Sequence, residues 1–108
     1  MRAPPRVEPG WYLTSSGGPI RVLGPEWDRS GLFSRTVVLV ITGHNPPHLH
    51  FEKWASGYLA HRLRRMTPLP APPEDRAHHG GGRTDVRHLS ARAEELARSW
   101  TPERHDDG

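Results

Sequence analysis

The segment TVVLVITGHNPPHLHFEKW, residues 36–54, decides the fold, because it contains the two clearest strands of the chain with two prolines between them. Residues 36–42 are nearly all apolar and rich in β-branched side chains, which is typical of a central strand covered on both faces. Proline has no amide hydrogen to donate to a strand ladder, so the proline pair predicts a break in pairing. Residues 48–54 then alternate between apolar and polar, which predicts a second strand with one face on the core.

The alternation of this second strand separates its side chains into two sets. Leu49 and Phe51 fall on one side, where we expect them to anchor the strand on the core. His48, His50 and Glu52 fall on the other side. The polar set is the most unusual feature of the sequence and the first candidate for a functional site.

Three further strands are expected around this pair. WYLTSS (11–16) and PIRVLG (19–24) flank a diglycine and predict a β-hairpin. Residues 25–35 read as a connection, with Trp27 and Leu32–Phe33 folding back on the core. After a turn at residues 55–57, YLAHRL (58–63) is expected to return as the partner strand of 48–54.

The C-terminal part of the chain predicts a loop followed by a helix. Residues 66–83 are rich in proline and glycine without any period, so we expect a long mobile loop. A helix capped by Thr84 or Asp85 is then expected to run to about Trp100. One apolar stripe is predicted for it, formed by Val86, Leu89, Ala93, Leu96 and Trp100.

Together these elements predict one small α+β domain over residues 10–101. It consists of an antiparallel sheet of about four to five strands with one C-terminal helix packed on it. The leader 1–9 and the tail 102–108 are expected to be disordered.

Composition narrows the class of protein. The 108 residues suffice for one domain and contain no cysteine, which excludes disulfides and thiolate zinc sites and fits a reducing compartment. The longest aliphatic run covers only residues 37–41, and the N-terminus lacks an apolar signal region, so we expect a cytoplasmic protein that does not enter a membrane. The net charge of +3 permits contact with nucleic acid without requiring it.

The histidine-rich segment supports two kinds of chemistry. Neutral imidazole is a common zinc ligand, so His44, His48 and His50 can form a metal site, with Glu52 as a fourth ligand or a base. Without a metal, two histidines can serve as general acid and base for RNA cleavage through the 2′-hydroxyl. The alternative to both is a solvated polar face on a proline-bent strand.

Three arginines follow the cluster in the sequence. Arg62, Arg64 and Arg65 are candidates for binding phosphate groups beside the histidines. The alternative is that HRLRR is a solvated strand end.

The motif resembles two families. PHLHFE (47–52) is similar to the signature of the lysostaphin-type zinc endopeptidases, which implies a base at His48 and a zinc ligand at His50. Those enzymes also need an upstream H-x-x-x-D ligand pair, and this sequence has no histidine before His44, so we interpret the match as local similarity.

The second resemblance covers more of the chain. VLVITGHNPPHLHFEKW, GYLAHRL and ARAEELARSW resemble, in that order, a family of small bacterial proteins of unknown function with an HNPPH-x-H-x-E signature. Gly43 stands where that family often has an acidic residue. The resemblance implies an α+β fold and a partner protein encoded nearby, in a gene arrangement like that of toxin–antitoxin pairs.

The leading functional prediction is therefore a member of a toxin–antitoxin-like module that acts on or binds RNA. His48, His50 and Glu52 are its predicted catalytic residues, without a cofactor. The first alternative is a zinc-binding protein or hydrolase that uses His44, His48 and His50, and the second is a non-catalytic interaction module. A small partner protein, RNA and a second copy of the chain are the expected partners, and a membrane is not.

Overall fold

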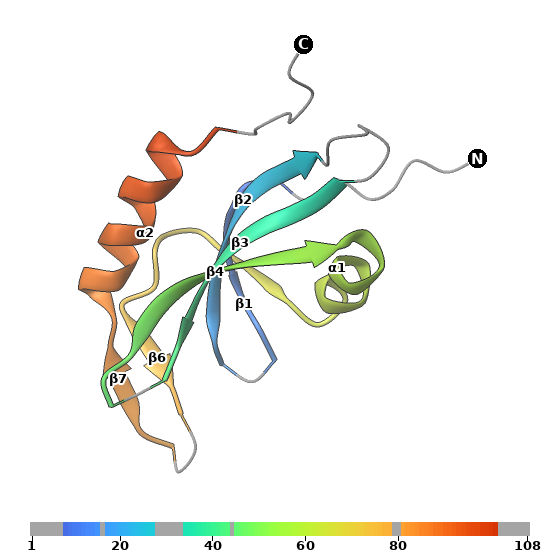
Figure 1. Ribbon diagram of the computed structural model, residues 1–108. Coiled ribbons are helices and arrows are strands. Elements are labelled where there is room, and N and C mark those ends of the chain that lie inside the picture. Colours follow the sequence, from blue (N-terminus) through green and yellow to red (C-terminus); the bar gives the residue numbers. More distant parts are fainter. Residues whose placement is uncertain (1–7, 16, 28–33, 44, 79–80, 102–108) are drawn as a thin grey trace.

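The computed structural model describes residues 8–15, 17–27, 34–43, 45–78 and 81–101, except for the side chains of residues 27, 34 and 56. The predicted α+β class is confirmed (Figure 1). The elements, in chain order, are β1 (Gly10–Leu13), β2 (Pro19–Trp27), β3 (Ser34–Thr42), β4 (His48–Ala55), α1 (Ser56–Leu63), β5 (Thr67–Leu69), β6 (Asp75–Ala77), β7 (Arg83–Asp85) and α2 (Arg87–Ser99). Neither helix in this described part of the chain has the length and apolar character needed to cross a membrane.

Five strands form one antiparallel sheet in the order β4-β3-β2-β1-β5. The predicted hairpin is confirmed as β1 and β2, and β2 also pairs with β3 from Ser34 to Val40. Strands β6 and β7 form a separate two-stranded sheet. Figure 1 shows α1 and α2 on opposite sides of the five-stranded sheet, so each sheet face has its own helix.

Strand β3 is buried on both faces, as its composition predicts. Val37, Leu39 and Ile41 point to the α2 side and join a core with the helix stripe. Val38 and Val40 point to the α1 side, where Val38 belongs to a second core. Because side chains alternate along a strand, this single nine-residue element contributes to two cores.

Helix α2 confirms the predicted stripe. Val86, Leu89, Ala93, Leu96 and Trp100 all pack in the core on that side of the sheet. The helix begins at Arg87, and the Asp85 carboxylate, just outside the helix, accepts the Arg87 backbone N–H at 2.9 Å. Hydrogen bonds from the Arg87 side chain and then its backbone lower the pKa of Asp85 from 3.8 to about 2. The N-cap residue itself is Val86, which makes no side-chain capping hydrogen bond, so the cap predicted at Thr84 or Asp85 lies too early in the sequence, and Asp85 only supports the first turn.

The main difference from the prediction lies after β4. Residues 58–63 belong to helix α1 and do not form a strand that pairs with β4. Leu59 and Leu63, four residues apart, fall on the same side of the helix and pack in the second core. The fifth strand of the sheet is β5, which pairs with β1 at the opposite edge.

The segment predicted as a long loop, residues 66–83, also differs from expectation, because it contains β5, β6 and the start of β7. Its backbone is tied to the rest of the domain. The Ser90 hydroxyl donates to the Pro73 carbonyl at 2.6 Å, and the Val86 N–H donates to the Glu74 carbonyl at 2.7 Å. Arg76 Nε donates to the carbonyl of Ile41 at 3.1 Å, which satisfies a group near the end of β3.

Some predictions fall on parts of the chain that the structure does not describe. These are most of the leader 1–9, the tail 102–108, the Leu32–Phe33 pair and the side chain of Trp27. Glu8, at the end of the leader, is described, and its carbonyl accepts a hydrogen bond from the Tyr12 hydroxyl.

The contact between Gly24 and Trp100 gives a test of how α2 docks on the sheet. A Cβ at Gly24 would lie 2.9 Å from the Trp100 ring, and the φ of Gly24 is +148°. Gly24→Ala should therefore lower the free energy of unfolding, measured by denaturant titration. Gly10→Ala is the control, because Gly10 has a φ of +153° and nothing within 4 Å of its Cβ position. We expect Gly24→Ala to lower the free energy of unfolding by about 1–3 kcal/mol more than Gly10→Ala does, because only the Cβ at residue 24 is overpacked. Equal losses would show that α2 does not rest on Gly24.

Candidate functional site

Strand β4 holds the candidate site at one edge of the sheet. It pairs with β3 so that His48, His50 and Glu52 lie opposite Thr42, Val40 and Val38, respectively. Since Val38 faces the α1 side, the three polar residues lie on that side too, as their alternation predicts. His48 is exposed, and His50 and Glu52 are partly buried.

Glu52 is the centre of the cluster because both of its oxygens have partners. Oε2 lies 2.8 Å from His50 Nε2, and Oε1 accepts a hydrogen bond from the Trp54 indole N–H at 2.8 Å. The hydrogen bond from Trp54, followed by the one from His50, lowers the pKa of Glu52 below its ordinary 4.5, against an opposing effect of partial burial. Electrostatic attraction to His50 and Arg62 adds to the lowering of this pKa. Glu52 is therefore an oriented carboxylate anion at neutral pH.

Arg62 reaches the cluster from helix α1. Its guanidinium carbon lies 5.5 Å from the centre of the Trp54 ring and 5.8 Å from that of Tyr58, at cation–π distance from both. Trp54 and Tyr58 meet edge to face, with ring centres 5.2 Å apart. Within the described ranges, Arg62 Nε is buried and lacks a hydrogen-bond acceptor. Arg62 is thus a positioned cation beside an oriented anion.

His48 has a defined place at the exposed end of the cluster. Its ring centre lies 5.9 Å from that of His50, with a tilt of 34° between the planes. The ring lies close to Gly43, where an added Cβ would meet Nδ1 at 3.1 Å. The φ of Gly43 is +77°, which favours glycine. The structure thus gives a local reason for glycine at the position where the resembling family often has an acidic residue.

The structure brings some of the predicted site residues together and leaves others apart. His48, His50, Glu52 and Arg62 form one cluster. Arg64 and Arg65 lie in the exposed turn after α1, and in the described part of the chain their side chains make no ion pair. They remain candidates for phosphate contacts only as exposed cations near the end of the helix.

The metal prediction depends on His44, which lies outside the described residues. Among the residues that are described, no three histidine or carboxylate side chains are grouped so as to hold a metal ion. The pair His50 and Glu52 is instead joined by a direct hydrogen bond. This contact with the carboxylate orients the His50 imidazole.

Trp54 and Tyr58 were not among the predicted site residues. A strand at 58–63, as the sequence predicts, would place Tyr58 and Arg62 far apart along the chain, whereas in α1 they lie one helical turn apart. Trp54 could have been found, because it is two residues beyond Glu52 and so lies on the same face of β4. The same alternation that places His48, His50 and Glu52 on one face also places Trp54 there.

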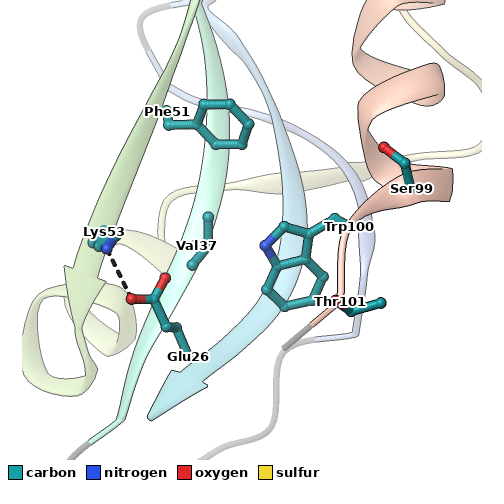
Figure 2. Close-up of a pocket in the computed structure, with 7 residues that line it drawn as sticks. All are labelled: Glu26, Val37, Phe51, Lys53, Ser99, Trp100 and Thr101. Carbon is teal, nitrogen blue, oxygen red and sulfur yellow. Dashed lines mark hydrogen bonds and ion pairs between the residues drawn. The ribbon is translucent and has the colours of Figure 1, made fainter. Parts of the chain in front are cut away.

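A pocket of about 330 Å³ lies on the opposite face of the sheet and is distinct from the histidine cluster. Figure 2 shows Trp100 on one side of it, and Phe51 and Lys53 of β4 on the other. Lys53 Nζ donates to Glu26 Oε1 at 2.8 Å across Val37. Phe51, expected as an anchor of β4, is 52% exposed, and only Leu49 of that predicted pair packs in the core.

The charge of Glu52 can be tested through the pH dependence of stability. Because the folded-state pKa is lowered, the ionised carboxylate stabilises the fold above about pH 4.5, and this contribution is lost as the pH falls through the folded-state pKa. Glu52→Gln should therefore lower the melting temperature by a few degrees near neutral pH and by progressively less below about pH 4. Glu95→Gln, on an exposed part of α2, is the control for loss of one surface charge. A Glu52→Gln effect that does not change with pH would contradict this role of the charge.

Comparison with models of known protein families, with curated proteins and with solved structures gives no match for this chain. The resemblance to the HNPPH-x-H-x-E family accordingly stays a prediction that rests on the quoted motifs.

Proposed function

We propose that this protein acts on RNA through the cluster on β4, as a cytoplasmic member of a toxin–antitoxin-like module with a small partner protein. The observation that carries the proposal is the hydrogen-bonded series Trp54–Glu52–His50, with His48 next to it. A carboxylate held by an indole N–H and bound to an imidazole is a fixed geometry. A solvated strand face without a function does not require such a fixed arrangement of side chains.

The reaction that fits two neighbouring imidazoles is cleavage of RNA by its own 2′-hydroxyl. The 2′-oxygen attacks the adjacent phosphorus, the bond from phosphorus to the 5′-oxygen breaks, and a 2′,3′-cyclic phosphate and a free 5′-hydroxyl result. One group must take the proton of the 2′-hydroxyl, and another must give a proton to the departing 5′-oxygen. No external water or oxidant is needed for this step.

His50 is suited to be the base and His48 the acid. A proton on His50 Nε2 satisfies the hydrogen bond to Glu52 and leaves Nδ1 as the proton acceptor. Glu52 then acts as a positioning residue that stabilises the imidazolium formed when His50 takes up the proton. His48 is exposed, with its ring centre 5.9 Å away, so a phosphodiester can approach both rings.

The surroundings of the cluster fit an RNA strand. Arg62 supplies a positive charge over Trp54 that acts on Glu52, and Arg64 and Arg65 extend the positive charge at the end of α1. Tyr58 is 48% exposed and offers a ring on which a base can stack. These contacts are independent of base identity, which suits a single-stranded RNA of mixed sequence.

The test is cleavage of an end-labelled single-stranded RNA by the purified protein. We expect cleavage products that end in a 2′,3′-cyclic phosphate, and no cleavage of the same oligonucleotide with 2′-deoxyribose throughout. His48→Ala and His50→Ala should each lower the rate by about 10²–10⁴-fold, the usual contribution of a general acid or base. Glu52→Gln should cause a smaller loss.

The matched control is His88→Ala, which removes an exposed imidazole from α2 and should leave the rate unchanged. Melting curves of each variant separate loss of activity from loss of fold. Activity that disappears with a chelator and returns with zinc would replace this proposal with the metal alternative. Full activity of the His48→Ala, His50→Ala double variant would refute it.

A further inference from the structure

We infer that the open edge of β4 pairs with β4 of a second copy of this chain, in antiparallel orientation about a two-fold axis through Phe51. The inference concerns the edge of the strand and does not depend on the proposed reaction on RNA. It starts from the position of β4, which pairs only with β3 among the described residues. Eight residues without proline or glycine therefore present one row of backbone groups outward.

The two edges of the sheet are very different. The other edge is β5, which has three residues with Pro68 in the middle, and Pro70 follows it. Short edge strands and proline are common ways to prevent unwanted pairing. A lysine that points outward from an edge strand also prevents pairing. The Lys53 side chain instead lies over the sheet face, where Nζ is 2.8 Å from Glu26 Oε1, as Figure 2 shows. Of the two edges, β4 is the one that remains suited to pairing.

Symmetry restricts how two β4 strands can pair. Opposite residues in an antiparallel pair point to the same face, so a two-fold axis must pass through a residue and not between two residues. With the axis at Phe51, each His50 lies opposite the partner's Glu52, and each Leu49 lies opposite the partner's Lys53. Moving the axis by one residue places His50 against His50 or Glu52 against Glu52. The register at Phe51 is therefore the self-complementary one.

This register explains the exposure of Phe51. The side chain is 52% exposed on the monomer, although the strand alternation predicts that it points toward the core side. On the axis, the two phenyl rings lie directly opposite each other, where aromatic cross-strand pairs stabilise a sheet. Leu49 and the aliphatic part of Lys53 from each copy then flank the two rings on the same face.

On the other face, the register builds one joint cluster. His50 already binds Glu52 of its own strand at 2.8 Å. With the second copy in place, imidazole and carboxylate alternate around a ring of four groups, His50, Glu52, the partner's His50 and the partner's Glu52. Each carboxylate then has an imidazole from both chains within reach, because opposite residues have Cβ atoms about 4.5–5.5 Å apart. The second copy thus contributes a residue to the site of the first.

The absence of cysteine from the chain allows a direct test of the register. Phe51→Cys should give a disulfide-linked dimer under mild oxidation, because the two Cβ atoms on the axis are close to disulfide distance. Ala55→Cys is the matched control, because residue 55 lies on the same face of β4 and is also exposed. In this register the two copies of residue 55 are about 27 Å apart, so it should not cross-link. A cross-link at residue 55 and none at residue 51 would overturn the inference.

Sedimentation of the unmodified full chain over a concentration series is the second readout. We expect a species of twice the 12.2 kDa chain mass. Phe51→Glu, which places two carboxylates against each other at an exposed position, should yield monomer with an unchanged far-ultraviolet circular dichroism spectrum. A wild-type chain that stays monomeric, or a Phe51→Glu variant that stays dimeric, would overturn the inference. RNA cleavage by the monomeric variant is scored separately, so failure of either proposal is distinguishable from failure of the other.

Discussion

The burial of β3 on both faces is the constraint on which the rest of the structure depends. Its side chains alternate between a core under α2 and a core under α1, and Val38 and Leu39 are both fully buried. Among the described residues, the core under α2 contains no residue of α1 and the core under α1 contains none of α2, so β3, with β2 beside it, joins the two cores. A small domain has few fully buried residues, and a doubly covered strand uses each of its positions for packing.

This arrangement explains where a polar cluster can exist in so small a domain. Strand β4 lies beside β3, and its α1 face becomes more exposed toward its beginning: Trp54 is buried, Glu52 and His50 are partly buried, and His48 is exposed. At the buried end, Trp54 fixes the carboxylate, because an indole N–H inside a core needs an acceptor. At the open end, the imidazoles remain accessible. The core therefore orients the Glu52 carboxylate, and the open end of the strand keeps the imidazoles of His48 and His50 accessible.

The sequence predicted the strands and α2 well where periodicity extended over many residues, as in 36–42 and in the stripe that ends at Trp100. It failed for 58–63, because a mixed apolar and polar segment of six residues is too short for its pattern to distinguish a strand from a short helix. Only the tertiary contacts of Leu59 and Leu63 distinguish the two. The cluster on β4 was predictable from alternation, whereas the place of Arg62 was not, because it depends on α1 being a helix.

The replacement of the expected strand by α1 has a consequence for function. A strand at 58–63 would have paired with β4 and covered its outer backbone groups, whereas the helix covers part of one face and leaves the edge open. The open backbone edge and the histidine cluster are then both formed by the same eight residues of β4. A partner strand of either kind, from a second copy or from another protein, places its side chains directly opposite His50 and Glu52. Pairing at the edge must therefore change the surroundings of the imidazoles, which couples assembly to whatever the cluster does.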